Sequence, residues 1–355
     1  MVASPIQKVD VRQSTNLAEL LEQLGGSLLV TTYQAGQTIG IGIHNGQVAF
    51  SSCRFQQAMG MTRTPTGLAL ATKHEIWDLP AQKQLAPHIK PSGSYDIAFM
   101  ARSCHVTGPI MAHEIGWCGG QLWVVNTLCN CLATLESPWS FVPRWSPPFI
   151  TATTPEDRCH LNGLAIEEDG SMPAVVTMHA ASDHPDGWRA KKATSGVVME
   201  VNSGEVLLGG LAMPHSPRLH RGELYVLNSG EGQLLRINRK SGAADVVAEL
   251  PGFTRGLDLI GNTAIVGLSR IRETAVFGDL PISERHKELH CGIAFVDITS
   301  GTLQGFCWLD NGIEELFALT FLPGFRNPIL TNPRSKADEK DEDSQVIWVV
   351  PPTQT

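Results

Sequence analysis

The feature that most constrains the fold is an internal repeat. Two five-residue segments, Leu122–Asn126 (LWVVN) and Leu224–Asn228 (LYVLN), are near copies offset by 102 residues, and each follows a turn that contains glycine. The same offset places His215 on His113, so two histidines occupy one position in two repeats. Short β-type runs that recur in this way indicate a fold built from repeated small sheets.

A glycine within a strand-like run extends the repeat along the chain, at Gly67, Gly163 and Gly256. The residue three positions before this glycine defines six equivalent slots, 38 to 62 residues apart: Thr64, His113, His160, His215, Phe253 and Glu315. The fourth repeat has Arg218 and the sixth has Ala318 in place of the glycine. This spacing is close to the ~40–50 residues of a propeller blade. The sequence therefore predicts an all-β, six-bladed β-propeller with a short N-terminal helical arm.

The repeat also sets the expected domain organisation. Residues 1–26 are predicted to form an arm with a short amphipathic helix from about Asn16 to Leu24, and residues 27–355 a single propeller domain. The early strand Ser27–Thr32 has no inner partner of its own. We expect it to complete the last blade beside Gln345–Val350, which would close the ring and remove a sheet edge.

Composition narrows the classes of function. The chain has 27 basic and 35 acidic residues, a formal charge of -8, so no large basic surface for nucleic acid is expected. No segment approaches the ~20 apolar residues of a membrane-spanning helix, and the N-terminal residues do not resemble a secretory signal. The eight cysteines are scattered through strand-like segments of the sequence, which predicts free thiols in a cytoplasmic protein. Nothing in the sequence predicts an oligomeric state.

The slots suggest a metal site. If each slot lies where an inner strand enters the central channel, His113, His160 and His215 converge on the axis and Glu315 approaches from across it. Three imidazoles and a carboxylate suit a transition metal such as Fe, Cu, Zn or Mn, and they do not suit calcium. His105 is an alternative ligand, while His179 is expected in a loop. A metal-free polar channel and a misaligned repeat remain the alternatives.

Two arginines lie close to the slots. Arg218 and Arg255 are predicted to face the same channel and to bind an anionic substrate group, because a guanidinium group recognises a carboxylate or a phosphate by paired hydrogen bonds. The alternative is structural: these arginines pair with carboxylates such as Glu114 or Asp258 and hold blades together.

Several segments carry a resemblance to a known group of proteins. PEDRCHLNGLA (155–165), the run around MPHSPR (213–218) and PGFTRGL (251–257) resemble those of an uncharacterised bacterial family of conserved hypothetical proteins. The resemblance covers nearly the whole chain. It implies a propeller-like fold and no settled activity, and the three segments coincide with the slots of His160, His215 and Phe253.

These observations favour a metal-dependent enzyme with its site in the propeller channel, acting on a small-molecule or peptide substrate with an anionic group. Iron or copper would favour oxygenase-type oxidation, and zinc or manganese would favour hydrolysis or lyase chemistry. A metal-free His/Arg lyase and a non-catalytic binding propeller are the other two readings, since propellers host many functions.

Overall fold

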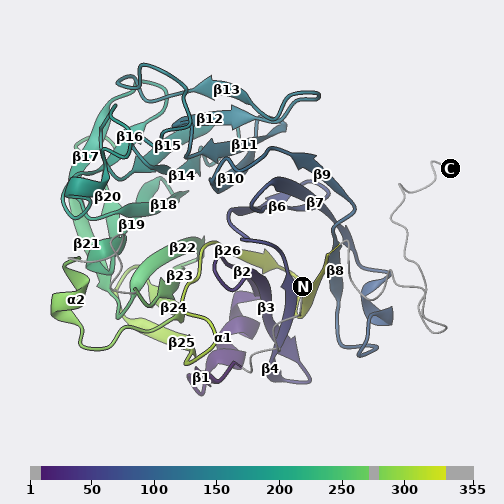
Figure 1. The fold of residues 1–355 in the computed structure, drawn as a ribbon. Helices are drawn as coiled ribbons and strands as arrows, with labels where there is room; N and C mark the ends of the chain where they lie inside the picture. Colours follow the sequence, from purple (N-terminus) through teal and green to yellow (C-terminus); the bar gives the residue numbers. More distant parts are fainter. Residues whose placement is uncertain (1–8, 272–279, 333–355) are drawn as a thin grey trace.

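The computed structural model describes residues 9–271 and 280–332 of the 355-residue chain. Within them, six sheets surround a common centre, which confirms the predicted six-bladed β-propeller. Figure 1 looks along the axis, with the inner strands β10, β14, β18, β22 and β26 closest to the centre.

Five blades take their four main strands from consecutive stretches of chain. From the axis outward, the first blade consists of β5 (Met61–Thr64), β6 (Gly67–Ala71), β7 (Glu75–Gln82) and β8 (Ile97–Met100), and the second of β10 (Ala112–Cys118), β11 (Gln121–Asn126), β12 (Cys131–Thr134) and β13 (Val142–Trp145). The third blade consists of β14 (Leu161–Ile166), β15 (Pro173–Met178), β16 (Gly196–Glu200) and β17 (Val206–Leu211), and the fourth of β18 (Pro214–His220), β19 (Glu223–Asn228), β20 (Gln233–Ile237) and β21 (Ala244–Glu249). The fifth blade consists of β22 (Phe253–Ile260), β23 (Thr263–Ser269), β24 (Gly292–Asp297) and β25 (Leu303–Leu309). Short helices lie in the connections, namely η1 (Ala86–His88), η2 (Arg189–Lys191), η3 (Ser229–Glu231) and α2 (Ile282–Arg285).

The sixth blade joins the two ends of the chain. Its inner strand β26 (Leu319–Pro323) comes from the C-terminal part, and its other strands, β2 (Gly26–Thr32), β3 (Gln37–His44) and β4 (Gln47–Arg54), come from the N-terminal part. The early strand therefore closes the ring, but its partner is β26, with Leu28 opposite Phe321. The expected partner Gln345–Val350 lies outside the described residues.

Three further strands extend the blades. The strand β27 (Pro328–Thr331) adds to β8 in parallel, β9 (Ser103–Val106) pairs with β7, and β1 (Val11–Gln13) adds to the outer strand β25. Since β1 and β27 come from opposite ends of the described chain, both ends are held by pairing with outer strands of the two blades that flank the sixth blade.

Packing between blades explains the glycine that marks the repeat. A Cβ atom on Gly163 would lie 2.5 Å from Cδ of Pro217 in the next blade, and one on Gly116 would lie 2.5 Å from Cδ1 of Ile166. Both distances are far below van der Waals contact, so a larger residue at either position would require side chains of the next blade to move. Contact between blades therefore favours glycine at these two positions.

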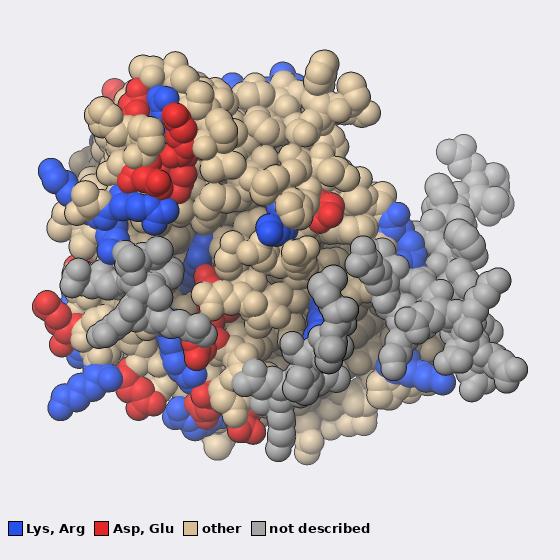
Figure 2. Space-filling model, in the orientation of Figure 1, with Lys and Arg blue, Asp and Glu red and all other residues tan. Residues whose placement is uncertain are grey.

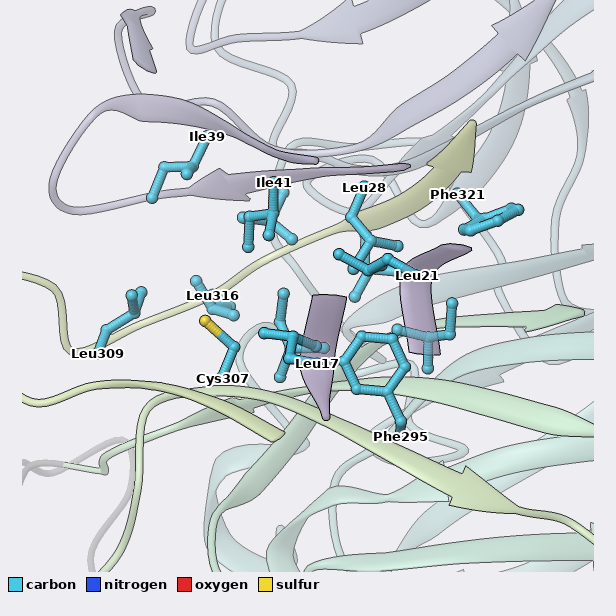
Figure 3. Close-up of a cluster of buried hydrophobic side chains, with 14 of the residues drawn as sticks. Leu17, Leu21, Leu28, Ile39, Ile41, Phe295, Cys307, Leu309, Leu316 and Phe321 are labelled. Carbon is cyan, nitrogen blue, oxygen red and sulfur yellow. The ribbon is translucent and has the colours of Figure 1, made fainter. Parts of the chain in front are cut away.

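The helical arm is part of the core. Helix α1 (Leu17–Leu24) begins after Asn16, as predicted, and ends at Gly25, whose φ of 70° suits a left-handed cap. Leu17, Leu20 and Leu21 are buried on one of its faces. Figure 3 shows the labelled leucines of α1 between side chains of β2 and β3 on one side and of β24 and β25 on the other. The arm thus fills the gap between the fifth and sixth blades.

Charges on the described surface are mixed. On the face drawn in Figure 2, basic and acidic side chains intermingle around the rim and form no extended basic field among the described residues. No helix in the described part of the chain is long and apolar enough to cross a membrane.

Candidate functional site

A cavity of about 250 Å³ lies at the end of the channel where the inner strands begin. Its wall brings together segments from all six blades: the residues just before β5, β14 and β26, and the first residues of β10, β18 and β22. Four histidines line it: His113, His160, His179 and His215. The three predicted slot histidines therefore reach one cavity, joined by a fourth that the sequence placed in a loop.

The four imidazole rings form a continuous row. Ring centroids are 4.8 Å apart for His113 and His160, 4.3 Å for His160 and His179, and 5.1 Å for His179 and His215. His160, His179 and His215 are 8%, 1% and 3% exposed. Because the rings touch one another and lie away from bulk water, their nitrogens have few partners besides the protein and whatever the cavity holds.

Two of the histidines are anchored in the same way. The Nδ1 atom of His113 lies 3.1 Å from the Met111 carbonyl oxygen and 2.8 Å from Thr127 Oγ1, and that of His215 lies 2.9 Å from both the Met213 carbonyl oxygen and Ser229 Oγ. A carbonyl oxygen only accepts, so each Nδ1 carries the proton and each Nε2 carries a lone pair. These anchors also repeat with the 102-residue offset.

Backbone strain accompanies this anchoring. Met111 and Met213 have φ angles of 54° and 49°, in the left-handed region that side chains other than glycine rarely adopt. His160 has a φ of 51° and Asp157 one of 45°. Such residues cluster at functional sites, where the surrounding structure holds them in place.

His160 is anchored by a carboxylate. Its Nδ1 lies 2.8 Å from Asp157 Oδ2, and the indole nitrogen of Trp188 donates to the same oxygen at 3.1 Å. Asp157 is only 6% exposed. In the neutral ring, the carboxylate therefore fixes the proton on Nδ1 and leaves the Nε2 lone pair for the cavity, as an orienting carboxylate does for a catalytic histidine.

His179 differs from the others. Neither of its ring nitrogens has a hydrogen-bond partner within the described part of the chain. It directly follows the second strand of its blade, as Thr127 follows β11 and Ser229 follows β19. An imidazole thus replaces the hydroxyl that anchors His113 or His215. His179 directly follows an apolar Val-Val-Thr-Met run in the sequence. That position could have predicted that His179 ends a strand instead of lying in a loop.

Burial disfavours the charged form of three of the four rings. It lowers the pKa of His113, of His179 and of His215 well below the ordinary 6.5. The neighbouring imidazole of His160 adds to this for His113 and His179, and the Arg255 guanidinium does so for His215. These three rings are consequently neutral at pH 7.

Arg255 and Glu315 face the same cavity. The Nη1 atom of Arg255 donates to Glu315 Oε1 at 3.3 Å, and its Cζ lies 3.4 Å from the ring centroid of Phe317. Arg255 is 7% exposed, and its Nη2 has no hydrogen-bond partner among the described residues. Burial lowers its pKa to about 10, although Glu315 counteracts this, so the side chain stays cationic at pH 7. The guanidinium group thus presents one unused donor beside the histidines.

The other arginine lies elsewhere. Arg218 lines a second cavity of about 180 Å³, where it pairs with Glu114 of another blade at 2.5 Å. The two arginines, which were predicted to face the same channel, therefore line two different cavities. Arg218 instead has the structural role that was the alternative prediction, because it binds Glu114 and links two blades. A side chain three residues further along an inner strand points further down the channel, away from the slot.

The slot residue Thr64 and the alternative ligand His105 both lie outside the cavity lining. Thr64 lies at the far end of β5, where its Oγ1 accepts a hydrogen bond from the Gly67 nitrogen. Gly67 opens the second strand of that blade, so the glycine pattern had selected the wrong strand. Met59 lines the cavity from this blade instead. His105 lies in β9, outside the cavity lining, where its Nε2 is 2.8 Å from the Trp139 carbonyl oxygen.

The predicted metal-ligand set can be compared with this geometry. Two imidazoles that bind one ion at about 2.1 Å through Nε2 have ring centroids roughly 4.6–5.3 Å apart, which includes the 4.8 Å between His113 and His160. Glu315 instead pairs with Arg255. Among the described residues, no group of three or more His, Cys, Asp or Glu side chains is arranged to hold a metal ion.

Comparisons with known proteins add the following. A family model described as a domain of unknown function, DUF4915, matches residues 15–331. No curated protein matches the sequence. The chain is similar in structure to a chain of a nidogen/laminin complex (7% identity, 84% of this chain and 99% of that chain, TM-score 0.49). It is also similar to a protein of unknown function from Bacteroides caccae (10%, 84% and 99%, TM-score 0.47) and to a streptogramin B lyase (13%, 75% and 78%, TM-score 0.42).

Proposed function

This chain belongs to the DUF4915 family, a domain of unknown function, and we propose that its axial cavity is the active site of an enzyme that acts on a small molecule with an anionic group. One observation carries the proposal: four imidazoles and the unused Nη2 donor of buried Arg255 line the same cavity. Buried polar groups without partners cost about 1–3 kcal/mol each, so such an arrangement is kept where a ligand supplies the partners. A volume of about 250 Å³ favours a small molecule over a peptide.

The first reaction class that fits is proton transfer without a metal. Arg255 would bind the anionic group of the substrate through Nη2, beside Glu315. His160 would take a proton from the neighbouring substrate atom at Nε2, and Asp157, bound to Nδ1, would stabilise the imidazolium that forms. If a leaving group sits on the next carbon, the electron pair of the broken C–H bond expels it. This is lyase chemistry, and the His160–Asp157 contact favours it.

The second class uses a transition metal, as the sequence predicted. A metal-binding histidine usually donates its other ring N–H to a carbonyl or a carboxylate, and His113, His160 and His215 all do so. His113 and His160 would hold the ion, since their rings have the separation of two ligands of one ion. His215 would join them only after a rearrangement, because the described residues hold no ready set of three ligands, and Glu315 only by leaving Arg255. An iron or copper ion would supply oxygenase-type redox chemistry, and a zinc or manganese ion would supply a Lewis acid for hydrolysis or lyase chemistry.

A cytoplasmic location is part of the same proposal. All eight cysteines are free thiols. Free thiols are typical of reducing compartments, whereas secreted proteins more often pair them.

The test starts from protein purified without added metal, whose metal content is measured by mass spectrometry. The protein is then incubated with a small-molecule extract of its host cells, with and without a chelator, and consumed compounds are followed by liquid chromatography and mass spectrometry. Variants His160→Asn and Arg255→Lys are run beside His88→Asn, which changes an exposed histidine far from the cavity.

We expect at least one compound to be consumed by the wild type and by His88→Asn, but not by the two cavity variants. Chelator-resistant turnover selects proton transfer, and turnover that is lost with the metal selects the metal class. If nothing is consumed, or if the cavity variants are as active as the wild type, the chain is not an enzyme of this cavity and the binding-propeller alternative replaces it.

A further inference from the structure

We infer that the ligand of the axial cavity is a small zwitterion, an amino acid whose ammonium group binds the histidines and whose carboxylate binds Arg255. This rests on the proposed function for the location of the site and deepens it by naming the substrate class. Three independent features of the cavity lead to it: the type of its hydrogen-bonding atoms, its charge, and the distance between its two polar ends.

The histidine end of the cavity offers acceptors. The Nδ1 atoms of His113, His160 and His215 are each held by a carbonyl or carboxylate oxygen, and none of the three Nε2 atoms has a hydrogen-bond partner within the described residues. Three lone pairs therefore face the cavity. A primary ammonium group has three N–H donors and no acceptor. An ammonium group matches these acceptors in kind, whereas a carboxylate or a phosphate would place acceptors against acceptors.

The charge of the cavity points the same way. Apart from the histidines, its inner charged side chains are Asp157 and Arg255, which are buried, and Glu315, which is 14% exposed; together these three carry one net negative charge. Arg189 also reaches the rim, but it is half exposed and paired with Asp186. A purely anionic ligand would therefore add negative charge to a site whose single buried cation already has a partner. A ligand that brings its own positive charge avoids this cost.

The carboxylate end is Arg255. Its Nη1 is engaged by Glu315, and its Nη2 donor is unused. Phe317 links the two ends, because its ring centroid lies 3.4 Å from Cζ of Arg255 and 5.2 Å from the centroid of His113. The guanidinium and the imidazole are thus at most 8.6 Å apart, the sum of those distances. This upper limit is short enough for one amino acid backbone to reach both groups through hydrogen bonds of about 2.9 Å.

The remaining wall indicates the side chain of that amino acid. It consists of three methionines, Met59, Met111 and Met213, and of the rings of Trp188 and Phe317. Thioethers and aromatic rings pack against apolar groups, and the rings also stabilise a nearby ammonium group. An apolar amino acid of moderate size, such as methionine, leucine or phenylalanine, fits this lining.

The test compares matched ligands on the wild-type protein by isothermal calorimetry in metal-free buffer. The panel contains methionine, leucine and phenylalanine, their analogues without the amine, and their analogues without the carboxylate. We expect at least one amino acid to bind, with both of its truncated analogues at least tenfold weaker. Arg255→Lys should weaken the amino acid and leave the amine analogue unchanged, and His215→Gln should weaken the amino acid and leave the acid analogue unchanged.

Every other outcome overturns the inference. If the acid binds as tightly as the amino acid, the histidines do not bind an ammonium group. If binding requires added zinc, iron or manganese, they bind a metal ion instead. If no member of the panel binds, the ligand is of another class. If an amino acid binds but is never consumed, the ligand inference holds and the proposed enzymatic function is wrong. If the protein instead consumes a compound of another class, the proposed function holds and the ligand inference is wrong.

Discussion

Replacing His179 by leucine should stabilise the protein. The ring is 1% exposed, and both of its nitrogens lack a hydrogen-bond partner in the described structure. An unpaired buried donor or acceptor costs about 1–3 kcal/mol, and the ring contains one of each. A hydrophobic replacement of similar volume costs less than about 1.5 kcal/mol in repacking. We therefore expect the free energy of unfolding at pH 8 to rise by about 1–3 kcal/mol, the signature of a residue kept for function.

The same variant should flatten the acid side of the stability curve. Because the pKa values of His113, His179 and His215 are depressed in the folded protein, the unfolded chain binds more protons below the ordinary value of 6.5. Their contribution is fully present above pH 6.5 and is lost as the pH falls. Each such group gives a slope of up to about 1.4 kcal/mol per pH unit. His179→Leu should remove one such contribution.

Urea unfolding followed by tryptophan fluorescence between pH 5.5 and 8 measures both effects. The exposed His88→Ala variant serves as the control, and its stability should change by less than about 0.5 kcal/mol. A His179→Leu protein that is less stable at pH 8, with an unchanged denaturant slope, would refute the reasoning, because the ring would then make a favourable polar contact in the unliganded protein.

Three further predictions concern single contacts. Arg255→Lys keeps the charge but loses the planar pair of donors, so an anionic ligand should bind about 1–3 kcal/mol more weakly by calorimetry; unchanged affinity would remove Arg255 from the site. Glu114→Gln leaves Arg218 without its counter-charge and should lower the free energy of unfolding by up to about 3 kcal/mol while ligand affinity at the axial cavity stays the same. A parallel loss of affinity would show that the two cavities are linked. Leu21→Ala should cost about 2–5 kcal/mol in urea unfolding, since Leu21 is fully buried in the α1 core; a cost below 1 kcal/mol would mean that the arm does not support the ring.

Local pattern determined much of this molecule. The copies Leu122–Asn126 and Leu224–Asn228 both lie in second strands of blades, because short continuous apolar runs after tight turns favour strands without distant contacts. The amphipathic spacing of Leu17, Leu20 and Leu21 specified helix α1. His113, His160 and His215 reach one cavity because equivalent positions of successive blades lie at equivalent places around the axis.

Contacts between distant segments decided the rest. The second strand β2 pairs with β26, almost 300 residues away, and no local pattern selects that partner over another apolar run. Arg218 donates a hydrogen bond to Glu114, 104 residues away, whereas Arg255 donates one to Glu315. His179 joined the other histidines only because the blade carries it to the axis. A side chain's backbone position follows from nearby residues, but its partners follow from which strands the closed ring brings together, and that closure exists only in the tertiary structure.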